Sequence, residues 1–325
     1  MKLIFHPGRQ GLSVLAALLM SDGLPLPLPA QSATPPPAAT VSQPGDGALT
    51  AARIRHKPMM PANPALPSLF IIGDSTVRNG EGNGGGGQWG WGEPIVALFD
   101  TNKINVVNRA LGGTSSRTYY LNLWPAVAAL LKPGDFVIMQ FGHNDSSAIN
   151  DTTRARGTIK GVGGETQEID NLLTKKHEVV HTFGWYERAM ITEARAHGAT
   201  PMVCSLIPRN TWRDGHAARN TKDYAGWAGQ VAAATQAPFL DINEIIARQY
   251  DSLGQENVKA LFIAGAGPHT SLAGAQTNAL CVVSALKALP ADPLAPYFSE
   301  AAAGIPPADL RPLPPVPVGL SPFKN

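Results

Sequence analysis

The sequence has few cysteines and little charge, and these scarcities exclude several classes of protein. Only two of its 325 residues are cysteine, which is too few for a disulfide-stabilised scaffold. Charged residues make up 15% of the chain, the formal net charge is +2, and Lys and Arg are scattered, so the chain lacks the basic patch of a nucleic-acid-binding protein. We therefore expect no nucleic-acid partner. We also expect Cys204 and Cys281 to be buried thiols rather than a disulfide pair.

Apolar runs long enough to cross a membrane are also lacking near the start of the chain. The apolar segment over residues 11–20 is shorter than the roughly 20 residues that a bilayer requires. It follows Lys2 and Arg9 and precedes small residues around Ala30, a pattern typical of an export signal. The sequence thus predicts a signal peptide over residues 1–32 and a secreted or periplasmic protein without stable membrane insertion after cleavage. A disordered amino terminus and a retained anchor are the alternatives.

Two further segments have little hydrophobic periodicity. Residues 33–67 are rich in Pro, Ala and Ser, and residues 301–325 contain Pro-Leu-Pro-Pro-Val-Pro. Such segments bury too little apolar surface to offset the entropy lost on ordering. We predict a disordered linker over the first and a Pro-rich tail over the second. The folded unit then covers residues 68–300, an ordinary size for one domain.

Within that unit, apolar segments typical of strands alternate with segments typical of helices. The longest helix is predicted from about His177 to His197, after a polar excursion over residues 146–176. Alternation of this kind indicates a parallel sheet covered by helices on both faces, a three-layer α/β/α fold. Because both faces are covered, its strands should be continuous apolar runs. Five segments meet this description: 69–73, 104–107, 135–140, 201–205 and 238–241.

The first predicted strand ends abruptly in Gly73-Asp74-Ser75. Ligands of open α/β sheets bind beyond the carboxyl ends of the strands. Ser75 is therefore a candidate nucleophile. The alternative is that Asp74 and Ser75 only cap a following helix.

Three other residues are placed where they could reach the same edge of the predicted sheet. Gly113 comes after the second predicted strand, Asn144 after the third, and His269 just before the last predicted helix. Acyl transfer needs a nucleophilic hydroxyl, a base to take its proton, and donors for the developing oxyanion. A glycine lets a backbone N–H approach the substrate closely, and an asparagine donates through its amide. Together with Ser75 and its own N–H, these residues meet the requirement.

The same residues, in this order, resemble the motifs of the SGNH (GDSL) hydrolase superfamily: Gly73-Asp74-Ser75, Gly113, Gly142-His143-Asn144-Asp145 and His269. Longer segments resemble the rhamnogalacturonan acetylesterases in particular: 108–118, 181–186, 204–209, 223–228 and 269–275. The resemblance covers about residues 69–290. It implies a flavodoxin-like sheet, Ser75 as nucleophile, His269 as base, Gly113 and Asn144 as oxyanion donors, and no metal or organic cofactor.

One position departs from the family pattern. The family has an aspartate three residues before the histidine, where it orients the imidazole, and this sequence has Ala266. No acidic residue lies between Lys259 and Ala291. Three hypotheses follow: a working Ser–His dyad, rescue by a carboxylate elsewhere with Asp241 as the candidate, or a weak or inactive relative that binds carbohydrate.

The resemblance implies a serine esterase that removes acetyl groups from a pectic polysaccharide such as rhamnogalacturonan, so an acetylated polysaccharide or oligosaccharide is the expected partner. Trp89 and Trp91 lie in a Gly-rich loop and could either stack on a sugar or pack the loop. Arg117 and Arg209 could bind galacturonate carboxylates. A lipid-type esterase is a further alternative, but it would require an apolar acyl groove that a Gly- and Trp-rich loop does not suggest.

Two histidines in the predicted long helix have a spacing that can bind a metal ion. His177 and His181 are four residues apart, so on a helix they would share a face. No third ligand is evident, and zinc sites use three or more protein ligands. We therefore expect a structural role for both and no bound metal.

Overall fold

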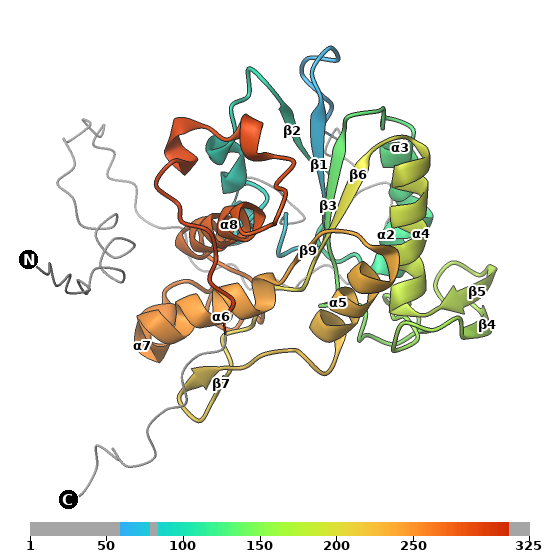
Figure 1. The fold of residues 1–325 in the computed structure, drawn as a ribbon. Coiled ribbons are helices and arrows are strands. Elements are labelled where there is room, and N and C mark those ends of the chain that lie inside the picture. The colour runs from blue at the N-terminus through green and yellow to red at the C-terminus, as the bar shows by residue number, and fades with distance from the viewer. Residues whose placement is uncertain (1–58, 79–83, 312–325) are drawn as a thin grey trace, which may run out of the picture. The chain divides into compact units, whose positions relative to one another are not determined.

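Five parallel strands form the centre of the computed structural model, which describes residues 59–78 and 84–311. Their order across the sheet is β2-β1-β3-β6-β9 (Figure 1). This is the flavodoxin-like order, in which the chain starts near the middle and extends to both sides. The predicted fold class is thereby confirmed. The strands are β1 (Ser68–Gly73), β2 (Asn105–Asn108), β3 (Phe136–Gln140), β6 (Thr200–Cys204) and β9 (Phe239–Leu240).

Helices cover both faces of this sheet, as Figure 1 shows. Leu69 and Ile71 of β1 belong to the apolar cluster shared with α6 and α8, whereas Phe70 and Ile72 belong to the cluster shared with α4 and α5. Burial on both faces explains why the strands lack a polar–apolar alternation. The helices are η3 (Pro94–Leu98), α2 (Ser116–Asn122), α3 (Trp124–Ala128), α4 (Phe183–Ala196), α5 (Tyr224–Thr235), α6 (Ile242–Leu253), α7 (Gln255–Lys259) and α8 (Leu272–Lys287).

The long helix predicted from His177 begins only at Phe183, so this part of the prediction is wrong. The Thr182 side chain accepts a hydrogen bond from the backbone N–H of Trp185 and caps α4. The residues before it form β5 (His177–His181), which pairs antiparallel with β4 (Thr166–Asp170) in the segment that we expected to be a polar excursion. Consecutive β-branched residues favour a strand when a partner strand is available.

The two histidines of β5 contact protein side chains. The His181 ring stacks on the Trp185 ring with centroids 3.7 Å apart, and His177 Nδ1 lies 3.3 Å from an Asp170 carboxylate oxygen. The structural role expected for His181 agrees with this packing.

The folded unit extends beyond both predicted boundaries. At its start, the backbone N–H of Asn63 donates to Asn105 Oδ1 at 2.9 Å. At its end, the N–H of Ala308 donates to the Ser284 carbonyl at 2.9 Å, and Lys287 Nζ donates to the Ile305 carbonyl at 2.9 Å. Residues 59–67 and 301–311 therefore pack on the domain, contrary to the predicted linker and tail. The predicted signal and the rest of both segments lie outside the described residues.

The described fold has several smaller features. Cys204 and Cys281 are free and buried, as expected. A second short hairpin joins β7 (Trp212–Arg213) to β8 (His216–Ala217), and the 3-10 turns η2 (Gly85–Gly87), η4 (Ala295–Tyr297) and η5 (Glu300–Ala302) lie in loops. Within residues 59–78 and 84–311, no helix has the length and apolar character needed to cross a bilayer.

Candidate active site

Ser75 and His269 meet at the carboxyl end of β1. Ser75 Oγ lies 2.8 Å from His269 Nε2, although the two residues are 194 positions apart in the chain. The loop that carries His269 is held in place by Trp89, whose N–H donates to the Thr270 carbonyl at 2.9 Å, and by Thr270 Oγ1, which donates back to the Trp89 carbonyl at 2.7 Å. The Ser75–His269 distance is within the reach that a general base needs to take a hydroxyl proton.

A tight turn presents Ser75 at this edge. A side chain at Gly73 would place its Cβ 2.5 Å from the Gln140 carbonyl oxygen, so glycine is required where β1 ends beside β3. Asp74 Oδ1 then accepts hydrogen bonds from Thr76 N and Thr76 Oγ1, both at 2.8 Å. Burial raises the pKa of Asp74 to about 6. Residues 75–77 form a turn, in which the N–H groups of Val77 and Arg78 donate to the Asp74 carbonyl at 3.1 and 3.0 Å.

The two predicted oxyanion donors lie on loops that touch each other. Gly113 has a φ of +86°, which favours glycine over residues with a side chain. Asn144 is buried, and its Nδ2 donates to the carbonyl of Thr114, next to Gly113, at 2.8 Å. This bond fixes the side-chain amide of Asn144 beside the Gly113 backbone.

Asp145 ties these loops together more firmly, and our sequence reasoning gave it no role. Its Oδ1 accepts from Ser116 N at 3.0 Å and from Ser116 Oγ at 2.5 Å, and its Oδ2 accepts from Gly142 N at 3.0 Å. The residue is fully buried, and burial raises its pKa to about 7 although the bonds from Ser116 and Gly142 oppose the shift. The position of Asp145 directly after Asn144 is the feature of the sequence that could have identified it.

Arg156 is a second residue that the sequence did not reveal. Its Nη1 donates to the carbonyl of Gly113 at 2.7 Å, and its Nε donates to Ser147 Oγ at 3.1 Å. The side chain is buried, and its charge acts to lower the pKa of Asp74. Arg156 therefore adds a buried positive charge behind the Gly113 loop. It lies in the segment predicted to be a polar excursion, so nothing in the sequence linked it to the site.

His269 lacks the partner that would orient its ring. Its Nδ1 is buried without a hydrogen-bond partner among the described residues. Burial lowers the pKa of His269, the nearby Ala266 carbonyl opposes this shift, and the Arg209 charge adds to it. Asp241 does not supply the missing carboxylate. Its Oδ1 caps α6 by accepting from the Glu244 N–H at 3.3 Å and also accepts from Ser205 Oγ at 2.9 Å. Because no described carboxylate reaches His269 Nδ1, the structure does not bear out the rescue hypothesis.

The four residues that we considered for substrate binding differ in burial and in hydrogen-bond partners. Trp91 is fully buried and its Nε1 donates to Gln140 Oε1 at 2.7 Å, so it packs the loop and cannot stack on a sugar. Trp89 is partly buried, and the structure leaves its predicted role untested. Arg209 is exposed and close enough to affect the pKa of His269.

Arg117 also departs from its predicted role. It is 1% exposed, and its Nε and Nη2 donate to the Glu178 carboxylate at 2.7 and 2.8 Å. Its Nη1 donates to the carbonyls of Ile149 and Gly157, both at 2.8 Å. With its donors committed to the protein, Arg117 joins α2 to the β4–β5 hairpin instead of offering a free guanidinium to a carboxylate ligand.

The parallel sheet with the order β2-β1-β3-β6-β9 carries a serine–histidine pair and two loops with candidate oxyanion donors at one edge. This arrangement defines the chain as an SGNH-type acylhydrolase. Comparison with known families agrees. The model of the GDSL-like Lipase/Acylhydrolase family matches residues 71–276, more than half of the chain. The chain belongs to this family, and it is therefore a carboxylic ester hydrolase by class.

Several known proteins are similar to this chain. A rhamnogalacturonan acetylesterase of Emericella nidulans is 27% identical over 196 residues, which are 60% of this chain and 75% of the relative. A probable rhamnogalacturonan acetylesterase of Bacillus subtilis, YesY, is 26% identical over 68% of this chain and 93% of its own length. The crystal structure of Bacillus subtilis YxiM is similar in fold, with a TM-score of 0.55 and 23% identity over 69% of this chain and 56% of that chain.

Proposed function

We propose that this protein is an exported serine esterase that removes acetyl groups from a pectic polysaccharide, with acetylated rhamnogalacturonan as the favoured substrate. The observation that carries the proposal is the 2.8 Å contact between Ser75 Oγ and His269 Nε2. Gly113 and Asn144 lie on the loops that follow the two neighbouring strands. The names of the two acetylesterase relatives support the choice of an acetylated polysaccharide.

The proposed reaction has two steps. His269 Nε2 takes the Ser75 hydroxyl proton while Ser75 Oγ attacks the acetyl carbonyl, and the oxyanion receives hydrogen bonds from the N–H groups of Ser75 and Gly113 and from the Asn144 amide. The imidazolium then protonates the departing sugar oxygen, which leaves acetyl-Ser75. In the second step, His269 takes a proton from water as the water oxygen adds to the acetyl carbon, and returns that proton to Ser75 Oγ as acetic acid leaves and ionises in solvent.

Proton transfer through His269 proceeds in this proposal without an orienting carboxylate. For Nε2 to accept the serine proton, the neutral ring must carry its hydrogen on Nδ1, which has no hydrogen-bond partner among the described residues. The imidazolium that forms is therefore stabilised less than it would be by a carboxylate at Nδ1. We therefore expect a working dyad that turns over more slowly than a complete triad.

A second candidate function is favoured by one observation. A relative that binds carbohydrate without turning it over would tolerate the unpartnered Nδ1 of His269. The two candidates differ in whether Ser75 is required for release of acetate.

The decisive experiment measures acetate release from acetylated rhamnogalacturonan, and hydrolysis of a chromogenic acetyl ester, by the full chain. We expect turnover by the wild type and its loss in Ser75→Ala. Ser252→Ala is the matched control, because Ser252 is exposed on α6 and should leave the activity unchanged. Activity that survives in Ser75→Ala would refute the serine mechanism. Folded wild-type protein that binds the polysaccharide without turnover would favour the second candidate.

A further inference from the structure

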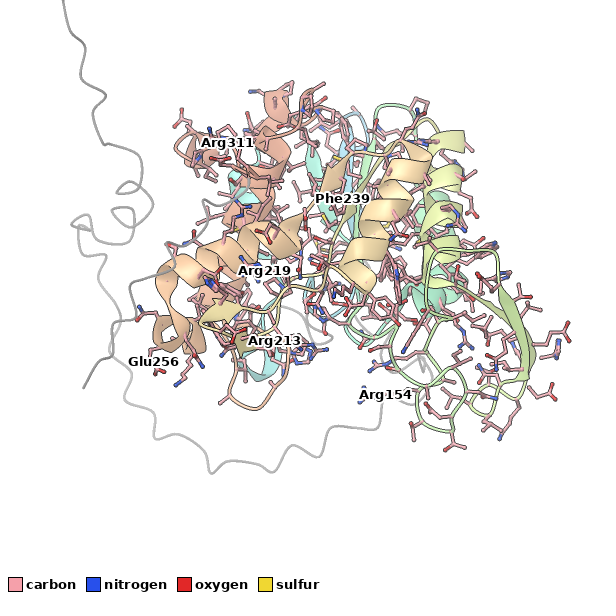
Figure 2. The ribbon with its side chains drawn as sticks, turned by 60° about the horizontal axis from the view of Figure 1, so that its bottom comes forward. Arg154, Arg213, Arg219, Phe239, Glu256 and Arg311 are labelled. Carbon is pink, nitrogen blue, oxygen red and sulfur yellow. The ribbon has the colours of Figure 1, made fainter. Side chains whose placement is uncertain are left out.

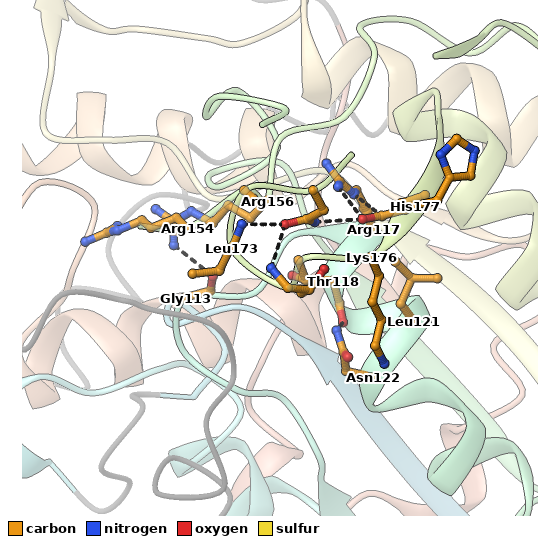
Figure 3. Close-up of a pocket in the computed structure, with 14 residues that line it drawn as sticks. Gly113, Arg117, Thr118, Leu121, Asn122, Arg154, Arg156, Leu173, Lys176 and His177 are labelled. Atoms are coloured by element: carbon orange, nitrogen blue, oxygen red, sulfur yellow. Dashed lines mark hydrogen bonds and ion pairs between the residues drawn. The ribbon is translucent and has the colours of Figure 1, made fainter. Parts of the chain in front are cut away.

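The side chain of Arg156 joins the two loops that carry the candidate oxyanion donors. Its Nη1 donates to the Gly113 carbonyl at 2.7 Å, and its Nε donates to Ser147 Oγ at 3.1 Å, in the loop that begins with Asn144. Figure 3 shows the bond to Gly113, where both residues line a cavity of about 430 Å³. Since Arg156 is only 8% exposed, a buried guanidinium links the loop after β2 to the loop after β3.

The backbone next to Arg156 is held against the second of these loops. The N–H of Gly157 donates to the Ala148 carbonyl at 2.9 Å. A Cβ at position 157 would lie 2.0 Å from the Ser147 carbonyl oxygen, so this close approach requires glycine. The main chain therefore fixes where the Arg156 side chain starts, and the side chain reaches from there to Gly113.

The residue before Arg156 has a strained backbone. Ala155 is buried and has a φ of +41°, in the left-handed region that residues with a side chain rarely adopt. Such strain persists where the surrounding structure over-determines it, and it is concentrated at functional sites. Arg154, on the other side of Ala155, lies on the loop that precedes the β4–β5 hairpin, apart from Arg213 on β7 (Figure 2). The strained bend places the Arg156 side chain between the two donor loops.

The loop after β2 needs such a link because the backbone of a glycine rotates freely. Gly113 has a φ of +86°, and its N–H is one of the donors assigned to the oxyanion. Arg156 holds the carbonyl of Gly113, and Asn144 Nδ2 holds the following carbonyl, that of Thr114, at 2.8 Å. With both carbonyls bound, the Gly113 N–H keeps one direction. A donor that is already oriented costs no reorganisation when the oxyanion forms.

The guanidinium also brings a positive charge to this side of the site. Burial raises the pKa of Asp74, and the charge of Arg156 is one of the influences that oppose this shift. Asp74 directly precedes Ser75, so the charge acts close to the nucleophile. In a buried site, a fixed positive charge stabilises the negative charge that develops on the acyl oxygen as Ser75 attacks.

We propose that Arg156 is a positioning residue for the oxyanion hole, which holds the Gly113 N–H toward the tetrahedral intermediate and adds positive potential behind it. The proposal rests on the proposed function, because an oxyanion forms only if Ser75 attacks an ester. It gives the segment before the β4–β5 hairpin a part in stabilising the transition state, and not in binding the substrate.

Steady-state kinetics of the full chain on a chromogenic acetyl ester tests this proposal. Arg156→Met removes the donors and the charge, and we expect kcat to fall about 10- to 100-fold with KM changed less than threefold. The reason is that a misdirected donor loses part of the 100- to 1,000-fold that one oxyanion donor supplies. Arg156→Lys keeps the charge without the planar guanidinium and should lose about three- to tenfold. Arg188→Met is the matched control, because Arg188 also donates to loop carbonyls, those of Val162 and Gly163, and its loss should leave kcat unchanged.

Inhibition by a small alkylboronic acid gives a readout that a merely structural role would not move. Ser75 Oγ adds to boron and its proton passes to His269, so the adduct is a tetrahedral anion like the reaction intermediate. Its inhibition constant should rise about 10- to 100-fold in Arg156→Met, in step with the loss in kcat/KM. Urea unfolding of each variant identifies those that are folded under the assay conditions.

The outcomes separate this proposal from the proposed function. If the wild type hydrolyses the ester through Ser75, but a folded Arg156 variant keeps wild-type kcat and boronate affinity, the positioning role is refuted and the esterase remains. Arg156→Lys supplies this test if Arg156→Met does not fold. An equal loss of kcat in Arg188→Met would also refute the role, because general loosening would then account for both. A folded wild type without Ser75-dependent hydrolysis would overturn the proposed function and the role of Arg156 together.

Discussion

Replacing Ala266 with aspartate should raise the activity of this protein. Residues 266–269 form a turn in which the His269 N–H donates to the Ala266 carbonyl at 3.3 Å, so a side chain at position 266 starts close to the imidazole. His269 Nδ1 is buried and lacks a hydrogen-bond partner among the residues described. An aspartate at this position can accept the Nδ1–H and stabilise the imidazolium that forms as Ser75 attacks.

The expected gain follows from the energy of that bond. A hydrogen bond to a charged group contributes about 1.5–3 kcal/mol, and each 1.4 kcal/mol is about tenfold in rate. Since His269 is only partly buried, we expect the lower part of that range, an increase of about 10- to 50-fold in kcat/KM for a chromogenic acetyl ester. The negative charge should also raise the pKa of His269 and move the acidic limb of the pH–rate profile to higher pH.

Two control variants distinguish the bond from other effects of the substitution. Ala266→Asn has a similar shape without the charge, so its gain should be smaller and its acidic limb should stay in place. Ala264→Asp adds the same charge at an exposed position of the same loop and should leave the rate unchanged. If folded Ala266→Asp shows neither the gain nor the shift, the missing carboxylate does not limit the wild type and our reasoning about Nδ1 is refuted.

Three more predictions concern other parts of the structure. Asn144→Ala should reduce kcat by about 100- to 1,000-fold, measured by steady-state kinetics, because it removes one oxyanion donor; a change under threefold would rule out that role. The acidic limb of wild-type kcat/KM should lie below about pH 6.5, because burial lowers the pKa of His269 and the base acts in its neutral form; a midpoint above that value would contradict it. Arg117→Ala should lower the free energy of unfolding by about 3 kcal/mol in urea, because it leaves Glu178 without its cation, whereas exposed Arg213→Ala should change it by less than about 0.5 kcal/mol.

The sheet and the placement of the candidate site were predictable from local sequence. Each of the five central strands lies within a residue or two of its predicted segment, because a strand buried on both faces is an apolar run whatever its neighbours are. Ser75, Gly113 and Asn144 follow three of these strands. Parallel strands bring their carboxyl ends to one edge, so residues at those ends are neighbours in any such sheet.

The errors occurred where the structure of a segment depends on a partner outside that segment. The segment His177–His181 forms a strand because Thr166–Asp170 pairs with it, and that partner has no pattern of its own. Residues 59–67 appeared disordered because their ordering depends on polar contacts such as Asn63 with Asn105, and not on apolar periodicity. Such contacts are invisible to reasoning based on the composition of one segment.

By itself, the sequence determined the family, the sheet and the absence of an aspartate at position 266. Only the tertiary structure decided whether another carboxylate replaces it, because it leaves His269 Nδ1 without a hydrogen-bond partner among the described residues and places Asp241 at the start of α6. It also decided which arginines can meet a ligand. Arg117 and Arg209 are chemically the same, but one is buried against Glu178 and the other is exposed. A side chain's role depends on its burial and on the partners that already occupy its donors, and both are set by residues far away in the chain.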